Sequence, residues 1–592
     1  MHEFNLLEEP WISVIVDDLG HTKLVSMMDV FQSAHEYKAL AGDMKMQDFS
    51  ILRLLLAVLH TVFSRYDTKG HARTFDPDED EAEDFDEESI EIWKEVWQAR
   101  RFPNIVCDYL NRWYNRFYLF DDEYPFMQVL AEDVSSDKLI ENKRKEKEPT
   151  PKEPTSIPGK YINRLISESN NKVALFSPKG NEKDKNHLTC SELARWLVTL
   201  QGYVGDPDKA LFKPKKYKAS KGWLFDLGGI TLAGSNLFET LMLNWVAANP
   251  YQSAASNQKP CWEYSGAENI QRTFSSARVD NIAQLYTRWS RAVYIPSRKD
   301  ENEPFTPSIV KLPDLDHKNA FIEPMTLWEY NKTEDNKDTF TPRKLRIEKQ
   351  RAKKHRTKKQ RTEKHHTKQQ RTEEAMWRSY SLLTLTHSLN DSAKYHRPEV
   401  ISWLDCISPY IENSRIVLEA ISVKDNGHGA SPVLTDEVYD NLYVHEELIT
   451  DVGNDGWVYR VNNEINHTET AVSKTYEHFL QDMCDIQNRS DDNSATFIDR
   501  TINHVYFLLD RPFRDWLAGI NPSDSKNECC DRWRATVKQL LKEEASQMVA
   551  NANTRDLNGI TVTEKTSGAA TTKNIITAYN AFIYRLNKLS GQ

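Results

Sequence analysis

The stretch SATFIDRTINHVYFLLDRPFRDWLAG, residues 494–519, decides what kind of fold the C-terminal part of the chain adopts. Its apolar residues recur every three or four positions: Ile498, Ile502, Val505, Leu509, Phe513 and Trp516. That spacing places them on one face of an amphipathic helix. We expect Pro512 to kink or interrupt this helix, because proline lacks a backbone donor and its ring clashes with the preceding turn.

Three further amphipathic segments accompany it, at roughly 464–487, 528–550 and 571–589. In the last of these, apolar residues again keep helical spacing: Ile575, Ile576, Tyr579, Phe582 and Leu586. Amphipathic segments joined by polar loops bury their apolar faces against one another. The sequence therefore predicts an all-α four-helix bundle over residues 461–592.

The first 460 residues mix strand and helix patterns. Residues 11–16 (WISVIV) are typical of a strand, and residues 46–63 (MQDFSILRLLLAVLHTVF) of a buried helix with Asp48 or Ser50 near its start. Helical patterns return at 190–203, 236–247, 376–389 and 398–411. The expected fold class is therefore α+β: a large mixed α/β N-terminal domain over 1–460, followed by the all-α bundle.

The formal net charge of the 592 residues is −11, but it is unevenly distributed. Residues 76–91 hold eleven carboxylates, whereas residues 343–371 hold fourteen Lys/Arg against two Glu, a local charge of +12. The rest of the chain therefore carries −23. Since an acidic surface does not coat nucleic acid, any nucleic-acid contact must be local.

The basic residues lie in a low-complexity insertion, at about 330–375, whose centre reads RAKKHRTKKQRTEKHHTKQQRTEE (351–374). This basic tract repeats with a period of ten and is almost free of apolar side chains, so it cannot bury a core. A solvated surface insertion and a segment that attracts phosphate non-specifically both fit this composition. Its histidines, His355, His365 and His366, have no carboxylate or cysteine partner spaced to complete a metal site.

Compartment signals favour the cytoplasm. The seven cysteines form no C-x-x-C pair, which fits a reducing compartment and argues against a cysteine zinc site. The start, MHEFNLLEEPWISV (1–14), lacks the basic and apolar regions of a signal peptide. No uninterrupted apolar run reaches the ~18 residues that indicate a membrane span.

Catalytic motifs are absent from the sequence. We find no phosphate-binding loop, dinucleotide fingerprint, G-x-S-x-G elbow or H-E-x-x-H pair. Asp314, Asp316 and His317 could hold a metal, although a surface turn explains this sequence more simply. We therefore expect no catalytic residue, no metal and no cofactor. The enzyme alternative is a metal-dependent nuclease, which would cut DNA by itself in magnesium.

One segment is basic and aromatic at once: KALFKPKKYKASKGW, residues 209–223. It holds six lysines, three aromatic residues and no carboxylate. Lysines bind phosphates by releasing counterions, and a residue as small as Gly222 lets a backbone approach a sugar or base. From these residues alone, a nucleic-acid contact and a solvated loop with inward-packed aromatics both stay open. A second loop, residues 173–187, has turn chemistry at 177–181 and is either plain surface or a binding finger.

Several blocks, taken together, resemble the large subunit of the type I-E CRISPR Cascade complex, the CasA family. In chain order they are FNLLEEPWI (4–12), YLFDDEYPFMQ (118–128), GSNLFETLMLNWV (234–246), LYTRWSRAVYI (285–295), EPMT (323–326) and WR (377–378). Each is short, but their order spans nearly the whole chain. The four C-terminal helical segments fit the same family.

The resemblance implies a non-catalytic subunit of an RNA-guided surveillance complex. Base pairing with the guide RNA would read the target, and this chain would read the protospacer-adjacent motif (PAM), largely from the minor groove. It also implies strand separation, R-loop formation and recruitment of a helicase–nuclease in antiviral defence. The implied partners are other Cascade subunits, guide RNA and target double-stranded DNA, with no membrane.

The resemblance also points to DNA-binding residues. Its first DNA-contact loop falls on Phe176, Ser177, Pro178 and Lys179, without the asparagine that the family often has there. A loop that is glycine-rich in the family is lysine-rich here, which implies phosphate contacts by Lys213, Lys215, Lys216, Lys218 and Lys221 beside Gly222. A protruding lysine falls on Lys311 or Lys318. The strand-separating wedge falls on residues 426–430, which contain no glutamine. Either His428 or Asn426 would take its place, or the backbone of the turn, which includes Gly429, would act alone.

The basic tract has no counterpart in the family pattern, so we expect it to be dispensable for motif reading. The structural alternative is an RNA-binding assembly scaffold that uses this tract and does not read duplex DNA. Equal binding to RNA and to any duplex would favour that alternative.

Overall fold

The computed structural model describes residues 4–75, 82–140, 153–157, 187–206, 208–213, 217–219, 221–252, 258–275, 279–297, 303, 307–332, 338–345, 375–385, 395–411, 414–425, 432, 434–563 and 570–590. The chain forms two compact units. The first comprises Met1–Gln350, Thr386–Tyr410 and Ile416–Asn441, and the second comprises Arg351–Leu385, Ile411–Arg415 and Leu442–Gln592. The boundary expected at residue 460 stays a prediction.

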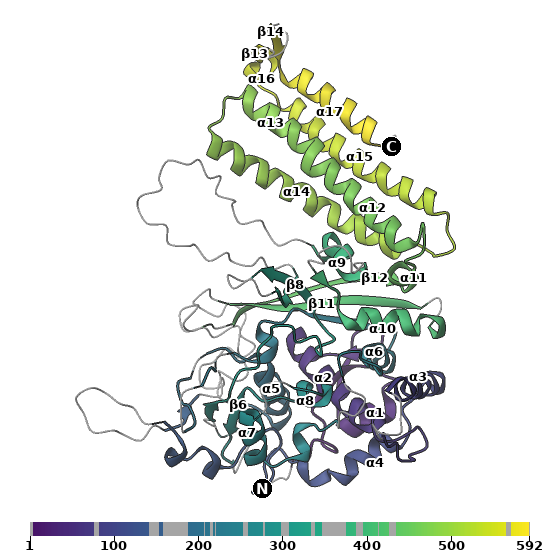
Figure 1. Ribbon diagram of the computed structural model, residues 1–592. Coiled ribbons are helices and arrows are strands. Elements are labelled where there is room, and N and C mark those ends of the chain that lie inside the picture. Colours follow the sequence, from purple (N-terminus) through teal and green to yellow (C-terminus); the bar gives the residue numbers. More distant parts are fainter. Residues whose placement is uncertain are drawn as a thin grey trace, which may run out of the picture. The chain divides into compact units, whose positions relative to one another are not determined.

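Helix α2 (Lys45–Phe63) lies at the centre of the first unit (Figure 1). Its residues from Met46 onward are all buried, and it packs against α5 (Cys190–Tyr203) and α8 (Ile282–Tyr286). Length and composition alone would let this helix cross a membrane, but its apolar window is wholly buried inside the protein. A helix that is apolar all round belongs in a core. The buried helix predicted at 46–63 is confirmed.

The first turn of α2 is capped from a distant strand. Glu437, on β12 (Leu434–His445), accepts hydrogen bonds from the backbone amides of Lys45 and Met46 at 3.2 and 2.6 Å. A carboxylate at this position satisfies amides that have no partner within the helix and complements the helix dipole. Asp48, expected near the helix start, lies in the same turn.

Small sheets complete the first unit. The strand predicted at 11–16 is confirmed as β1 (Ile12–Ile15), the centre of a sheet with order β2-β1-β3. The other sheets have the orders β4-β7-β6, β10-β8-β9 and β12-β11-β5. The remaining strands are β2 (Thr22–Val25), β3 (Ala39–Leu40), β4 (Thr155–Ser156), β5 (Gly229–Ala233), β6 (Arg291–Tyr294), β7 (Ser308–Lys311), β8 (Leu327–Lys332), β9 (Asp338–Arg343), β10 (Tyr395–His396) and β11 (Arg415–Asp425).

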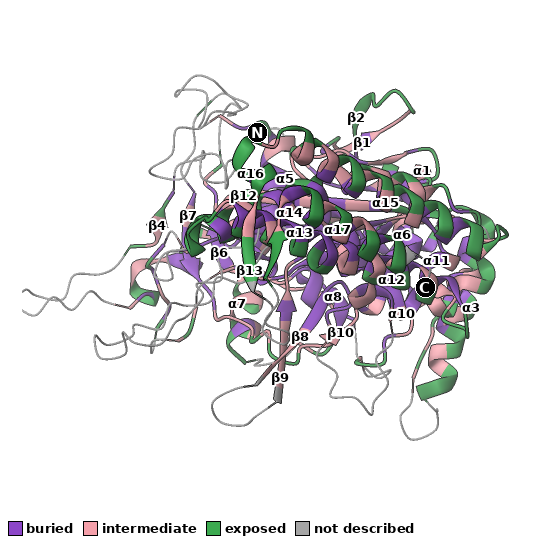
Figure 2. Ribbon diagram, turned by 90° about the horizontal axis from the view of Figure 1, so that it is seen from above, coloured by how far each residue is buried: buried purple, intermediate pink, exposed green. Residues whose placement is uncertain are grey.

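Shorter helices cover these sheets and α2. They are α1 (Met27–Ser33), α3 (Ala82–Ala99), α4 (Ile105–Arg112), α6 (Leu237–Asn244), α7 (Gly266–Ser275) and α10 (Glu399–Ile407). Helix α3 is amphipathic: it buries Trp93 and Trp97 and exposes its acidic side, as its colours in Figure 2 show. The described part of the acidic run, residues 82–91, therefore forms the first half of a surface helix.

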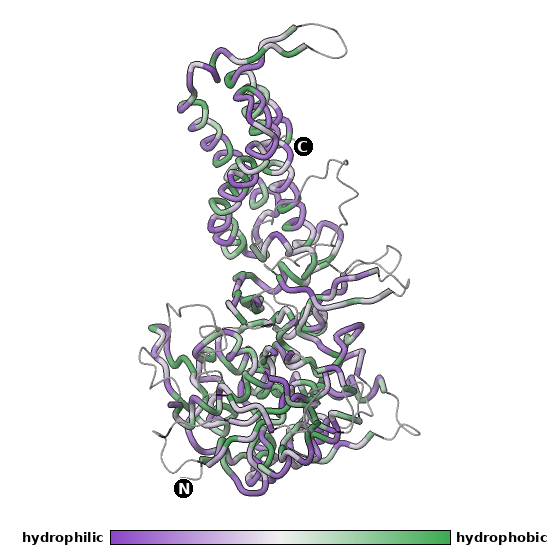
Figure 3. The backbone as a smooth tube through the Cα atoms, turned by 90° about the vertical axis from the view of Figure 1, so that its left-hand side faces the viewer, coloured by the Kyte–Doolittle hydropathy of each residue, from purple (hydrophilic) through white to green (hydrophobic). Residues whose placement is uncertain are grey.

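The second unit is helical. Helix α12 (Trp457–Thr470) continues through a π-helical turn into α13 (Glu477–Ile486), and α14 (Asp491–Ala518), α15 (Lys526–Ala550) and α17 (Ile575–Ser590) pack alongside. Hydrophilic and hydrophobic residues alternate along these helices (Figure 3). Shorter helices are α9 (Tyr380–Thr384), α11 (Glu447–Thr450) and α16 (Thr554–Asn558). The helical C-terminal region is confirmed.

Two local expectations in this region need correction. Helix α14 runs past Pro512 to Ala518, so the interruption expected there is wrong, while a kink at Pro512 stays a prediction. The last helix begins at Ile575 rather than 571, because residues 570–573 form strand β14 (Ala570–Lys573), which pairs with β13 (Ile560–Thr563). Threonine-rich sequence favours a strand over a helix.

Candidate nucleic-acid interface

The basic and aromatic segment 209–223 is anchored on the first unit by its aromatic residues. Phe212 forms a backbone bridge with Leu139, and its amide donates to the hydroxyl of Tyr217 at 3.1 Å. The Tyr217 hydroxyl in turn donates to the carbonyl of Lys311 in β7. Burial raises the pKa of Tyr217 to about 12, so the hydroxyl remains a donor at neutral pH. These contacts fix the segment and leave its lysines in different environments.

Three of the five lysines expected to hold phosphates are described. Lys213 and Lys218 are exposed, and Lys213 donates to the carbonyl of Asp137 at 2.8 Å. Lys221 is half-buried, with its Nζ 2.5 Å from a carboxylate oxygen of Asp226. Because that ion pair already neutralises the Lys221 ammonium group, Lys213 and Lys218 are better placed to contact a phosphate.

Gly222 packs against the end of α5. A Cβ at this position would lie 2.2 Å from the carbonyl oxygen of Gly202. The Gly222 amide donates a hydrogen bond to the carbonyl oxygen of Val204 at 2.8 Å. Only glycine allows two backbones to approach this closely. The close approach at Gly222 is therefore made to the protein's own helix, and its contact with DNA stays a prediction.

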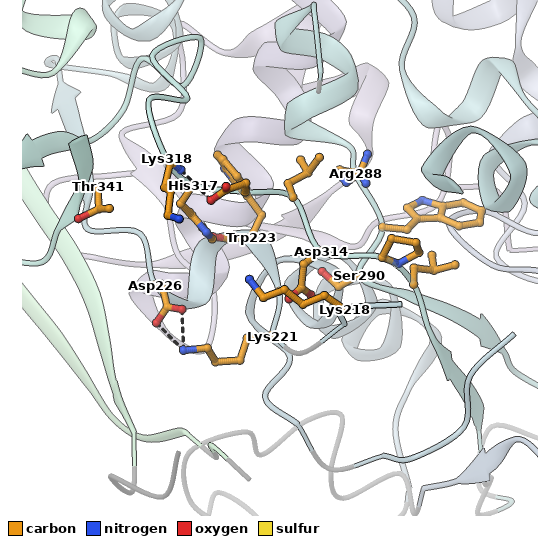
Figure 4. Close-up of a pocket in the computed structure, with 16 residues that line it drawn as sticks. Lys218, Lys221, Trp223, Asp226, Arg288, Ser290, Asp314, His317, Lys318 and Thr341 are labelled. Atoms are coloured by element: carbon orange, nitrogen blue, oxygen red, sulfur yellow. Dashed lines mark hydrogen bonds and ion pairs between the residues drawn. The ribbon is translucent and has the colours of Figure 1, made fainter. Parts of the chain in front are cut away.

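A cavity of about 190 Å³ opens beside this segment (Figure 4). Its walls come from the stretch Lys218 to Asp226, residues 288–290, the loop 312–318 after β7, and Thr341 of β9. Its charged side chains are Lys218, Lys221, Arg288, Lys318, Asp226, Asp314 and Asp316. With four cations against three anions, the lining is weakly positive and offers both donors and acceptors.

His317 lies flat on Trp223 inside this cavity. The ring centroids are 4.2 Å apart and the ring planes differ by 4°. His317 Nε2 is 2.8 Å from the carbonyl oxygen of Trp223 and must carry the proton, because a carbonyl only accepts. Burial lowers the pKa of His317, so the ring is neutral near pH 7. In that tautomer Nδ1 is a hydrogen-bond acceptor.

The Trp223 ring is held by a buried ion pair. Its Nε1 donates to Glu323 at 2.9 Å, and Arg53 of α2 donates to both carboxylate oxygens of Glu323 at 2.7 and 2.8 Å. The Arg53 and Glu323 side chains are 2% and 0% exposed. A fully buried pair with this geometry leaves little freedom to its neighbours. The core helix thereby sets the position of Trp223 and of the His317 ring stacked on it.

Further charged side chains lie close to the stacked rings of His317 and Trp223. Asp226 lies 2.5 Å from Lys221 and 3.9 Å from Lys344. Burial would raise the pKa of Asp226, but the two ammonium groups outweigh it and hold that pKa below its usual value. Burial lowers the pKa of Lys344 to about 8. Burial also lowers the pKa of Arg288 to about 10, against the attraction of Asp314.

The segment Asp314-Leu-Asp316-His317 runs along the cavity wall as irregular backbone and leads into a turn at Lys318 and Asn319. Asp316 accepts a hydrogen bond from the amide of Lys318, a pattern typical of turns, and His317 Nε2 is engaged by Trp223. Within the residues that the structure describes, no group of three or more His, Cys, Asp or Glu is arranged to hold a metal ion.

The family model for CRISPR-associated protein Cse1 matches residues 5–543. The chain belongs to this family. A curated relative, CasA/Cse1 of Thermus thermophilus, is 28% identical over 266 residues, which are 44% of this chain and 42% of the relative. The aligned part therefore spans less than half the length of that relative. The resemblance found in the sequence blocks is confirmed.

Solved structures share the fold of this Cse1 family member. Thermobifida fusca Cse1 is 22% identical with a TM-score of 0.71, and the match covers 100% of this chain and 98% of that one. A chain of a CRISPR RNA-guided surveillance complex is 13% identical with a TM-score of 0.59, covering 99% of each chain. These matches agree with a mixed α/β region followed by a helical region.

Lys311 and Lys318 were the candidates for the protruding lysine. Lys311 lies in β7, its side chain is 10% exposed, and its ammonium group pairs with Asp206. Lys318 is exposed and lines the cavity. Moving Lys311 onto a phosphate would leave Asp206 without its partner, so the geometry favours Lys318.

The other predicted contacts lie outside the described residues and stay predictions. They are Phe176, Ser177, Pro178, Lys179, Lys215, Lys216, Asn426, His428 and Gly429, together with the basic tract. The strands that flank the expected wedge are described: β11 and β12 are neighbours in one sheet, and residues 426–433 connect them.

The sequence did not predict that the buried Arg53–Glu323 ion pair holds the Trp223 ring in place. One signal was present, because Arg53 interrupts the apolar run SILRLLLAV (50–58), and a charge on a buried helix requires a partner. The partner lies 270 positions along the chain, and no local pattern reveals it.

Proposed function

We propose that this Cse1 family member is the large, non-catalytic subunit of a type I-E CRISPR RNA-guided surveillance complex (Cascade). The observation that carries the proposal is the family match over residues 5–543. The fold shared with a chain of a CRISPR RNA-guided surveillance complex supports it. Its partners would be the other Cascade subunits and the guide RNA, in the cytoplasm.

The chain would read the PAM in double-stranded DNA at the cavity beside residues 217–223. Lys218 and Lys318 are exposed where they line the cavity, and exposed lysines supply affinity that does not depend on base sequence. The loop 176–179 would probe the groove. Because the minor groove carries a degenerate code, more than one PAM should be accepted.

Strand separation would follow at the connection between β11 and β12. Residues 426–430, with Asn426, His428 and Gly429, would intrude at the first base pairs and promote R-loop formation. The helical second unit would hold displaced DNA and help to recruit the helicase–nuclease. The basic tract 351–374 would have no part in motif reading.

Strand opening tests the proposal directly. Guide-loaded complex, assembled with and without this chain, is mixed with target duplexes that carry 2-aminopurine at the first base pair beyond the flanking motif. Fluorescence should rise only when the chain is present and the flank is the preferred one, because an unstacked 2-aminopurine fluoresces more strongly.

An equal rise without the chain, or with either flank, would contradict the proposal. Magnesium-dependent cutting by the purified chain would instead support the nuclease. Equal binding of RNA and of any duplex would support the assembly scaffold.

A further inference from the structure

His317 presents one hydrogen-bond acceptor to the cavity. Its Nε2–H is engaged by the carbonyl of Trp223 at 2.8 Å, which leaves Nδ1 as the ring's acceptor. Nδ1 has no hydrogen-bond partner among the described residues, and the half-buried His317 lines the cavity. The polarity of this position is therefore set by the protein before any ligand binds.

The ring cannot easily present a donor instead. Turning it over would break the bond to Trp223 and disturb a stack whose planes lie within 4° of each other. Trp223 is itself fixed by Glu323, which is fully buried against Arg53. A rigid acceptor discriminates better than a mobile one, because an unsuitable partner cannot be accommodated by rotation.

Minor-groove chemistry matches this acceptor at one base. A·T pairs show only acceptors in the minor groove, whereas a G·C pair adds the exocyclic N2 amino group of guanine, which is a donor. Facing Nδ1, that amino group forms a hydrogen bond, while an A·T pair sets two acceptors against each other. Lys218 and Lys318 lie on the same cavity and can contact the flanking phosphates.

We propose that His317 is a specificity-determining residue, whose Nδ1 accepts a hydrogen bond from the N2 amino group of a guanine in the flanking motif. The inference rests on the proposed motif-reading function and adds to it the preferred base pair and the residue that selects it. At one position of the motif, G·C should therefore be preferred to A·T.

The first test changes only the DNA. Inosine is guanine without the N2 amino group, so its major-groove edge is unchanged. Replacing the contacted guanine with inosine should weaken binding of the assembled complex about fivefold, the usual value of one hydrogen bond. Inosine pairs more weakly with cytosine, which by itself eases strand opening, so weaker pairing cannot imitate the expected loss. Adding the amino group to an adenine, as 2,6-diaminopurine, should strengthen binding.

The second test changes the protein. His317→Phe keeps an aromatic ring on Trp223 but removes Nδ1, so guanine and inosine should then bind equally. His396→Phe is the matched control. His396 also stacks on an aromatic ring, Phe321, and also engages a backbone carbonyl, that of Arg397 at 2.8 Å, but it does not line the cavity. This control should keep the fivefold preference for guanine.

The outcomes distinguish a failure of the proposed role of His317 from a failure of the proposed motif-reading function. If the wild-type complex prefers one flank but inosine at each guanine of that flank changes nothing, the inference fails and motif reading stands. The inference also fails if His317→Phe keeps the guanine preference. If the wild-type complex prefers no flank, both fail.

Discussion

Replacing Glu323 with glutamine should destabilise the first unit strongly, although the two side chains have nearly the same shape. Each carboxylate oxygen of Glu323 accepts two hydrogen bonds: Oε1 from Arg53 and the Met325 amide, Oε2 from Arg53 and Trp223. Glutamine retains one oxygen, and its NH₂ group faces two donors whichever way it turns. Two of the four bonds are lost, and Arg53 becomes a buried charge without a counterion.

The free energy of unfolding that Glu323→Gln loses can be calculated in two ways, both of which describe the same loss. Hydrogen bonds to charged groups contribute about 1.5–3 kcal/mol each, so losing two costs about 3–6 kcal/mol. Breaking a buried ion pair by removing one partner costs about 3–5 kcal/mol. Both estimates support a loss of about 3–5 kcal/mol, which is a large part of the ~5–15 kcal/mol that stabilises a typical domain.

Urea denaturation of the isolated chain measures this cost, with separate transitions fitted for the two units if they unfold apart. The double variant Arg53→Met/Glu323→Leu is the control, since replacing both partners with apolar side chains of similar size is often neutral. It should recover most of the lost stability. A cost below about 1 kcal/mol for Glu323→Gln would refute the reasoning, because a buried carboxylate with four partners cannot be exchanged so cheaply.

Four other predictions test separate parts of the account. Lys218→Ala in the assembled complex should reduce the slope of log affinity against log salt by about one; an unchanged slope would remove Lys218 from the phosphate contacts. Deleting residues 351–374 should leave discrimination between flanks unchanged at fixed salt, and lost discrimination would give the tract a role in reading. Gly222→Ala should cost about 1–3 kcal/mol in urea denaturation, because the added Cβ would overlap the Gly202 carbonyl, and a neutral change would contradict that packing. Burial raises the pKa of Asp48 to about 6, above its value in the unfolded chain. The stability that this carboxyl group contributes is therefore present below about pH 4 and is lost, by about 3 kcal/mol, as the pH rises through 6. In urea denaturation from pH 4 to 7, the stability of the Asp48→Asn variant should depend less on pH than that of the wild type.

Periodicity was a sound guide to the helices of the second unit, because each of them buries one continuous face. It placed the last helix four residues too early, at 571, where backbone pairing between β13 and β14 takes precedence. It also gave no sign of the carboxylate that caps α2, because Glu437 lies 391 positions from Met46. The pattern of apolar residues within one helix or strand predicts which side of it is buried. It does not predict contacts with residues from distant segments of the chain.

The candidate site was predictable only in part for the same reason. Composition drew attention to residues 209–223, and two of their lysines, Lys218 and Lys221, line the cavity. The family resemblance offered Lys311 or Lys318 as the protruding lysine, and the structure pairs Lys311 with Asp206. The stack of His317 on Trp223 joins residues 94 positions apart, and the local sequence around His317 predicted only a surface turn. Residue types indicated the chemistry of the region, but only the fold reveals which groups remain available to a ligand.

The central claim, that this chain makes the complex sensitive to the flanking motif, is tested most directly by a mobility-shift titration. Guide-loaded complex with and without the chain is titrated against two target duplexes that differ only in the flank, at one salt concentration. The account predicts that one flank binds more tightly and that the difference disappears when the chain is omitted. Equal binding of both flanks by the complete complex, or failure of the chain to join the complex, would contradict it.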